Sequence, residues 1–131
     1  MGRMFNVEVF NQTISGSGSG SAPTFYTGQE HTAMLGSADS LLAQVTMEGT
    51  TDVTGTLTVT YQFCNTGRQE DWQDAVNSAT VSAGSATAIP KTTMYLISSG
   101  SELGAFGRYK VSFNKGESVT VRIVVCGRTQ S

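Results

Sequence analysis

Residues 56–64 alternate strictly between apolar and polar side chains, and residues 118–126 place an apolar side chain at every second position. This period of two constrains the fold more than any other feature of the sequence. In a β-strand, successive side chains point to opposite faces, so each segment presents one apolar face. The residues on these faces are Leu57, Val59, Tyr61, Phe63, Val119, Val121, Ile123 and Val125. We expect these eight side chains to form a core between two sheets.

Several other short segments have the same character. We expect strands over residues 5–11, 41–48, 93–98 and 108–113, and weaker strands over 79–82 and 86–89. The protein has 15 Ser, 18 Thr and 15 Gly among its 131 residues, and charged helix formers are scarce. Thr suits a half-buried sheet surface, and Gly and Ser supply turns. The sequence therefore predicts an all-β protein, a single-domain antiparallel β-sandwich that is jelly-roll-like and has at most one helical turn.

The N-terminal segment joins an apolar strand to a Gly/Ser tract. The apolar residues of this strand are Phe5, Val7, Val9 and Phe10. Residues 15–21 read Ser-Gly-Ser-Gly-Ser-Gly-Ser, a composition typical of a flexible tether. Such a tether lets the strand either pack on its own domain or pair with a neighbouring molecule. We expect an extended N-terminal arm (residues 1–21) whose strand contacts an adjacent subunit or another partner, and a β-sandwich domain (residues 22–131) that folds without it.

Charge is sparse and nearly balanced. The protein has 8 Lys and Arg against 10 Asp and Glu, a net charge of −2, and charged residues make up 14% of it. Binding a nucleic-acid backbone requires a dense set of cations, so we expect no nucleic-acid partner. The sequence has no run of about 18 apolar residues. Because residues 1–5 also lack the apolar core of a signal peptide, we expect no membrane segment and assembly in a cytoplasm.

Residues with catalytic or metal-binding chemistry are few. His31 is the single histidine, and its polar Gln-Glu-His-Thr surroundings are typical of a loop. A zinc site needs clustered ligands, and nucleophilic catalysis needs a base beside the nucleophile. We therefore expect no catalytic residues, no cofactor and no metal ion, and we expect that the protein is not an enzyme.

The densest cluster of charge surrounds the single tryptophan. Glu70, Asp71 and Asp74 flank Trp72 in the sequence. We expect a solvated loop here, either one helical turn or a bulge, with Trp72 packed on the edge of the sandwich. A paired-carboxylate hydrolase, a calcium loop and a sugar-binding platform at Trp72 are alternative interpretations of the same residues.

Cys64 and Cys126 each lie at the end of a predicted strand, on the face opposite its apolar stripe. A disulfide would form between them if those two strands pair. Because we expect assembly in a reducing cytoplasm, we expect both residues to be thiols.

Several segments, taken in order, resemble the small β-sandwich proteins of tailed bacteriophages. They are residues 39–48, residues 55–64 followed by Asn65-Thr66-Gly67 and Trp72, residues 103–111 (Leu-Gly-Ala-Phe-Gly-Arg-Tyr-Lys-Val), and a closing Val-rich strand. The resemblance covers residues 39–127. The class includes capsid decoration, or cement, proteins, which assemble from cytoplasmic subunits onto an icosahedral shell and have no catalytic residues.

The resemblance implies a function for this protein. We expect a non-enzymatic structural protein of a tailed-phage virion that binds and stabilises the capsid surface. Its partners would be the major capsid protein and further copies of itself in a homo-oligomer, assembled in the host cytoplasm. Another virion component, such as a neck, tail or fibre protein, and a carbohydrate-binding module are the alternatives.

Overall fold

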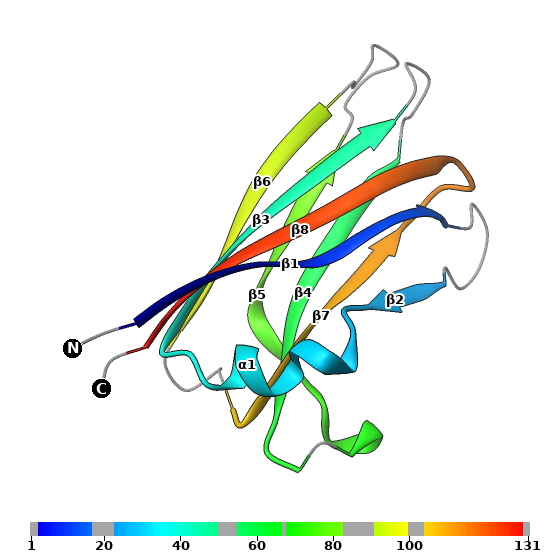
Figure 1. Cartoon of the computed structure of the whole chain (residues 1–131). Helices are drawn as coiled ribbons and strands as arrows, with labels where there is room; N and C mark the ends of the chain where they lie inside the picture. The colour runs from blue at the N-terminus through cyan, green and yellow to red at the C-terminus, as the bar shows by residue number, and fades with distance from the viewer. Residues whose placement is uncertain are drawn as a thin grey trace.

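A computed structural model describes residues 3–16, 23–49, 55–66, 68–82, 91–99 and 104–129. These residues form strands and three short helical segments (Figure 1). The strands are β1 (Arg3–Ser15), β2 (Thr24–Tyr26), β3 (Ser40–Gly49), β4 (Thr56–Cys64), β5 (Gln73–Ser82), β6 (Lys91–Ser99), β7 (Phe106–Phe113) and β8 (Ser118–Thr129). The helical segments are the 3₁₀ turns η1 (Gln29–His31) and η2 (Gln69–Asp71) and the helix α1 (Thr32–Gly36). None of them is long and apolar enough to cross a membrane.

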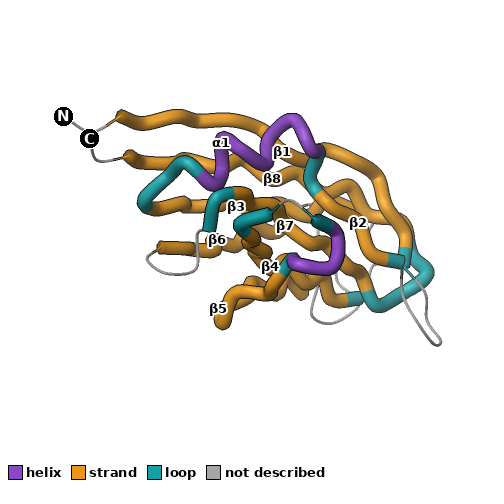
Figure 2. Tube along the Cα trace, turned by 90° about the horizontal axis from the view of Figure 1, so that it is seen from below, coloured by secondary structure: helices purple, strands orange, loops and turns teal. Residues whose placement is uncertain are grey.

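The strands form two four-stranded antiparallel sheets packed face to face (Figures 1 and 2). The first sheet has the order β1-β8-β3-β6 and the second has the order β2-β7-β4-β5. The hydrogen-bonded pairs include β1 with β8, β2 with β7, β3 with β6, and β4 with β5. The polypeptide is thus one long hairpin of four strand pairs rolled into two sheets, which is the jelly roll. The predicted fold class is confirmed.

The core lies between the sheets and follows the alternation of the sequence. In β7 and β8, the inward side chains are buried and those between them are more exposed. Seven of the eight predicted core residues are at most 1% exposed. The exception is Phe63, near the end of β4, which is partly buried and packs against the core from its margin. Tyr61 and Tyr109 meet at the centre in an edge-to-face contact, with ring centroids 5.1 Å apart.

The first strand belongs to this sandwich. β1 pairs with β8 along its whole length, as the outer strand of the first sheet. Of its apolar side chains, Val9, Phe10 and Ile14 are buried in the core, and Phe5 and Val7 pack against it. The sequence predicts residues 1–21 as an arm outside a domain of residues 22–131. Residues 3–15 instead complete a sheet of that domain, because their backbone pairs with β8 of the same molecule and their apolar side chains pack in its core.

A β-bulge explains why two consecutive side chains of β1 face inward. The pairing of β1 with β8 shifts register between Glu8 and Phe10. A bulge inserts one extra residue into a strand and so reverses the direction of the following side chains. Val9 and Phe10 are therefore both buried, although simple alternation places them on opposite faces.

Some elements differ from the sequence-based expectations. A helical turn or a bulge is expected around Trp72, and the structure has the 3₁₀ turn η2 directly before Trp72, with strand β5 beginning at Gln73. Helix α1 packs beside β7 with Leu35 buried, and the sequence does not predict it. Most of the predicted Gly/Ser tract and the weak strand predicted over residues 86–89 lie outside the described residues.

Candidate functional site

Three side chains from distant parts of the sequence stack together on the outer face of the second sheet. Alternation in β7 sends Tyr109 into the core and Arg108 to the opposite face. The guanidinium carbon of Arg108 lies 3.9 Å from the centre of the Tyr26 ring and 4.3 Å from that of Trp72. Tyr26 belongs to β2 and Trp72 directly precedes β5, and these two strands lie on opposite sides of β7 in the sheet. Both distances are within the range of a cation–π contact.

A row of hydrogen bonds across three strands holds this arginine in place. Asp74, Gln62 and Arg108 lie opposite one another on β5, β4 and β7. Arg108 Nε donates to Gln62 Oε1 at 2.8 Å, and Gln62 Nε2 donates to Asp74 Oδ1 at 2.7 Å. Lys110 Nζ donates to both carboxylate oxygens of Asp74, at 3.0 and 3.1 Å. Gln62, the middle member of this row, is buried.

The charges in this row are adjusted by their surroundings. The hydrogen bond from Gln62 and, after it, the hydrogen bond and charge of Lys110 lower the pKa of Asp74 below its usual range. Burial lowers the pKa of Arg108, because its charged form loses hydration between the two rings. Asp74 is thus a carboxylate compensated by Lys110, and Arg108 carries the charge that faces outward.

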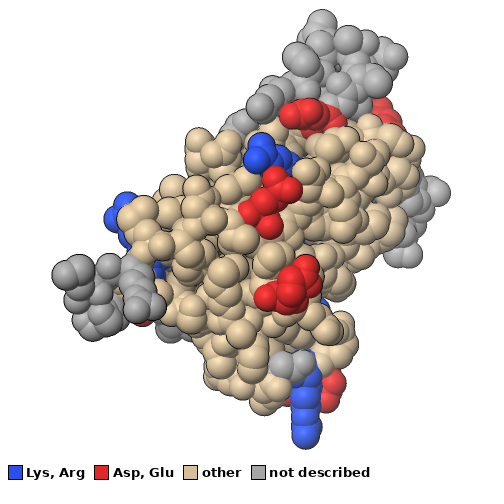
Figure 3. Space-filling view, viewed as in Figure 1, with Lys and Arg blue, Asp and Glu red and all other residues tan. Residues whose placement is uncertain are grey.

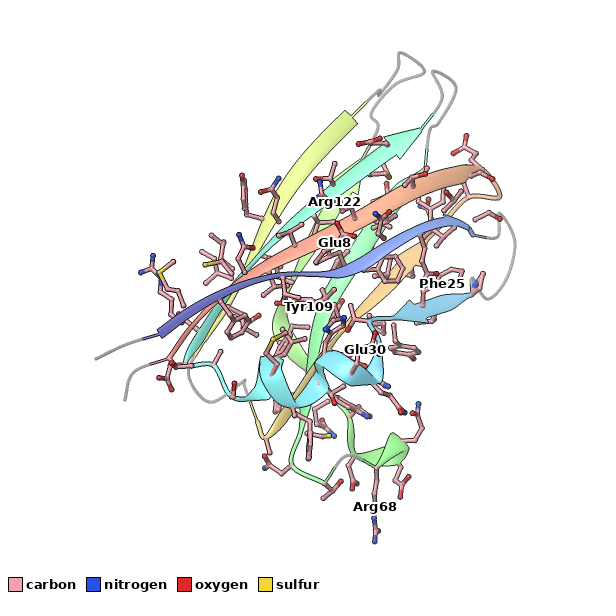
Figure 4. All side chains as sticks on the ribbon, in the orientation of Figure 1. Glu8, Phe25, Glu30, Arg68, Tyr109 and Arg122 are labelled. Atoms are coloured by element: carbon pink, nitrogen blue, oxygen red, sulfur yellow. The ribbon has the colours of Figure 1, made fainter. Side chains whose placement is uncertain are left out.

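A pocket of about 490 Å³ opens beside this stack. We call it the arginine pocket, and its lining residues are Tyr26, Thr27, Gln29, Thr32, Gln69, Trp72, Phe106 and Arg108. The 3₁₀ turns η1 and η2 supply Gln29 and Gln69, and Figure 4 shows Glu30 and Arg68 on or beside these two turns. Aromatic rings, amides and hydroxyls around one fixed cation are the mixture found in ligand pockets of this size.

A second surface lies on the outer face of the first sheet. Leu42 of β3 lies directly opposite Ile97 of β6, and Tyr95 is two residues from Ile97 on the same face. These three side chains, which we call the β6 patch, are 41%, 66% and 58% exposed, respectively. In the described residues β6 pairs with β3 alone and is the edge strand of its sheet. Figure 3 shows that the charged side chains on this side of the molecule are scattered among uncharged ones. Exposed apolar side chains at an edge strand are typical of an interaction surface.

The residues singled out in the sequence are distributed over several places. Trp72 lines the arginine pocket, with one ring face covered by Arg108, so a sugar ring would have only the other face. Asp71 accepts a hydrogen bond from the Thr66 hydroxyl, while Asp74 belongs to the row described above. Among the described residues, no group of three His, Cys, Asp or Glu side chains is placed to hold a metal ion.

His31 and Cys64 are not among the lining residues of the arginine pocket, whereas Cys126 lies directly opposite Leu42 and lines a pocket with Leu42 and Ile97 of the β6 patch. His31 Nε2 is 3.5 Å from a carboxylate oxygen of Glu30, at the end of η1. Cys64 on β4 and Cys126 on β8 belong to different sheets and form no disulfide with each other. The predicted contact of Phe5, Val7, Val9 and Phe10 with a neighbouring molecule stays a prediction, and the structure shows these residues packed within their own molecule.

Sequence reasoning missed Tyr26 and Arg108. Arg108 begins a strand that the sequence predicts, but Tyr26 lies in a segment for which the sequence predicts no strand, and nothing local shows that β2 and β7 are neighbours. Two features of the sequence could have pointed to this site. One is an arginine within an alternating strand, and the other is the single tryptophan beside carboxylates.

No known family model and no curated protein sequence matches this protein. Solved structures do. The capsid protein VP2 of infectious bursal disease virus, in a subviral particle, is 15% identical with a TM-score of 0.55, and the match covers 98% of this protein and 33% of VP2. The protein therefore corresponds to about a third of VP2, and at this identity the likeness concerns the fold.

Two further structures overlap less closely. A Bacillus endospore appendage, described as a disulfide-linked pilus, is 10% identical with a TM-score of 0.48, covering 99% of this protein and 90% of that one. The CBM22-1 and GH10 modules of xylanase 10B from Clostridium thermocellum, complexed with xylohexaose, are 10% identical with a TM-score of 0.49, covering 98% and 26%.

Proposed function

We propose that this protein is a non-enzymatic structural protein of a virus particle, and specifically a capsid decoration protein of a tailed phage. In this role it binds the major capsid protein as a homo-oligomer and is assembled in the host cytoplasm. The observation that carries the proposal is the β6 patch. It places three exposed apolar side chains on the outer face of a sheet, two of them on its edge strand and the third on the neighbouring strand.

The physical reason is the way in which shells are stabilised. Burying apolar surface contributes about 25 cal/mol per Å², and three half-exposed side chains make a modest contact on their own. Symmetry repeats such a contact many times, and linked copies bind much more tightly than single ones. The proposal is also supported by the jelly-roll likeness to VP2, whose structure was determined in a subviral particle.

The proposal is tested by measuring whether the protein binds to particles that lack it. These particles are produced by the native source after the gene for this protein has been deleted. Purified full-length protein is mixed with these particles, and the bound fraction is measured after sedimentation. We expect saturable binding that Ile97→Ser weakens at least about tenfold, which corresponds to about 1.4 kcal/mol. Gln12→Ala is the matched control, because Gln12 is exposed on β1 at the opposite edge of the same sheet.

The oligomeric state of the same variants is measured by analytical ultracentrifugation. Loss of particle binding with an unchanged oligomer would assign the β6 patch to the capsid, and loss of both would assign it to contacts between copies. Failure of the wild-type protein to sediment with particles would contradict the decoration role. Equal binding by Ile97→Ser and the wild type would contradict the assignment of the patch.

A further inference from the structure

We propose that the arginine pocket is a binding site for a carboxylate group on a polypeptide, either an Asp or Glu side chain or a terminal carboxylate. The pocket lies on the outer face of the second sheet, whereas the β6 patch lies on the outer face of the first. The inference therefore stands independently of the capsid-binding proposal.

The first argument is the fixed orientation of Arg108. Its guanidinium carbon lies over the rings of both Tyr26 and Trp72, which limits the freedom of the group to turn. Gln62 has to present its oxygen to Arg108 Nε, because its amide nitrogen is already used by Asp74. A guanidinium held in one orientation loses little further freedom when it binds, which favours affinity.

The second argument is the hydrogen-bonding capacity that remains. The bond from Nε to Gln62 is the hydrogen bond that Arg108 makes within the described residues. The two terminal nitrogens therefore keep four N–H donors without an acceptor in this part of the protein. Arg108 lines the pocket. Two parallel N–H groups on a planar edge match the two oxygens of a carboxylate.

The third argument is the charge around the pocket. Asp74, the carboxylate that belongs to the hydrogen-bonded row, is paired with Lys110, and Arg108 forms no ion pair within the described residues. The flanking turns η1 and η2 carry the acidic residues Glu30, Glu70 and Asp71, of which Glu30 and Glu70 are exposed. Exposure to solvent weakens the repulsion between these carboxylates and an anion bound at Arg108.

The fourth argument is the remainder of the lining. Phe106 and Trp72 offer apolar surface, while Gln29 and Gln69 offer amides that can pair with a peptide backbone. A volume of about 490 Å³ accommodates one or two residues of a polypeptide. These features fit a carboxylate carried on a polypeptide better than a free inorganic anion.

The experiment follows the Arg108 Nε–H and Trp72 indole N–H signals of the full-length protein by NMR, at constant ionic strength. The probes are N-acetylaspartate N-methylamide for a side-chain carboxylate and N-acetylglycine for a terminal carboxylate. Their neutral amides, sodium chloride and inorganic phosphate are the matched controls. We expect a saturable shift of both signals with at least one carboxylate probe, with a Kd in the millimolar range, and none with its amide. The probe with the lower Kd shows whether the site prefers a side-chain carboxylate or a terminal carboxylate.

Arg108→Lys keeps the charge but loses the planar pair of donors. We expect this variant to bind the same probe at least tenfold more weakly while its melting temperature shows that it is folded. The inference is overturned if the amides or chloride shift the signals equally, if phosphate binds more tightly than the carboxylates, or if Arg108→Lys binds as well as the wild type. Absence of any shift at about 100 mM probe, far above a millimolar Kd, also overturns it, and needs no variant.

Discussion

The hydroxyl of Tyr61 lies directly against Gly107, so that a Cβ atom at Gly107 would overlap the Tyr61 side chain. Tyr61 is fully buried on β4, and Gly107 is buried on the neighbouring strand β7. The absence of a side chain at position 107, one residue before Arg108, therefore makes room for Tyr61, one of the two largest side chains in the core.

Gly107→Ala is expected to destabilise the protein by about 1–3 kcal/mol, because an added methyl group in a packed core forces its neighbours to move. The free energy of unfolding in urea measures this. Gly116→Ala is the control, since a Cβ there would meet nothing closer than the Gly16 carbonyl oxygen at 4.0 Å. Equal stabilities of the two variants would show that Tyr61 does not need the space.

Deletion of residues 1–21 is expected to unfold the domain or make it aggregate. The deletion removes the buried side chains Val9, Phe10 and Ile14, each contributing about 1.5–3 kcal/mol, from a fold whose total stability is about 5–15 kcal/mol. It also exposes the edge of β8. Circular dichroism and thermal melting check this outcome. A truncated protein that folds with an unchanged melting temperature would show that β1 is a dispensable arm, as the sequence alone indicates.

Tyr109→Phe is expected to leave the stability unchanged or raise it by up to about 1–3 kcal/mol. Within the described residues, the Tyr109 hydroxyl is buried without a hydrogen-bond partner, and such a group carries an uncompensated cost of desolvation. The same burial raises the pKa of Tyr109. Tyr95→Phe, which removes an exposed hydroxyl, is the control. A loss of more than about 1 kcal/mol in Tyr109→Phe alone would reveal a hydrogen bond to this hydroxyl in solution.

The lowered pKa of Asp74 predicts part of the pH dependence of the stability of the fold. In the folded state Gln62 and Lys110 lower the pKa of Asp74. Its contribution to the stability of the fold is therefore fully present at a pH above the pKa that Asp74 has in the unfolded protein. That contribution is lost as the pH falls through the lower folded-state pKa. Between pH 7 and about pH 3, Asp74→Asn should therefore lose less stability than the wild type, measured as the shift of the urea midpoint. Identical shifts would mean that the row of Asp74, Gln62 and Arg108 does not hold in solution.

Cys64 and Cys126 are expected to react as two thiols per molecule in denatured, unreduced protein. The reason is that they lie on strands of different sheets and form no bond with each other. Titration with a thiol reagent measures this directly. A count of zero in monomeric protein would require a rearrangement of β4 against β8.

The strands could be located from the sequence because alternation is a local property. The strand β4 has the bounds that its alternation predicts, and the buried faces of β7 and β8 follow the same rule. The consecutive burial of Val9 and Phe10 could not be predicted in this way, because the bulge between them exists only in the pairing with β8.

The arginine pocket also could not be predicted from local sequence patterns, because it depends on which strands are neighbours. Trp72 attracted attention as a lone aromatic residue, but its partners Tyr26 and Arg108 are placed beside it by the strand order β2-β7-β4-β5. A row of side chains across three strands depends on register, and register is a property of the whole sheet. The β6 patch likewise requires Leu42 on β3 to be paired with Ile97 on β6.

The most direct test of the proposed role is a cryo-electron microscopy reconstruction of native particles from the source of this protein, with the icosahedral shell and the tail reconstructed separately. We predict density for the two-sheet jelly roll at symmetry-related positions on the outside of the shell, with the face that carries Leu42, Tyr95 and Ile97 in contact with the capsid protein or a neighbouring copy. Density for this fold only in the neck, tail or fibres would make it a different virion component. Particles that contain no copy of the protein would contradict a structural role in the virion.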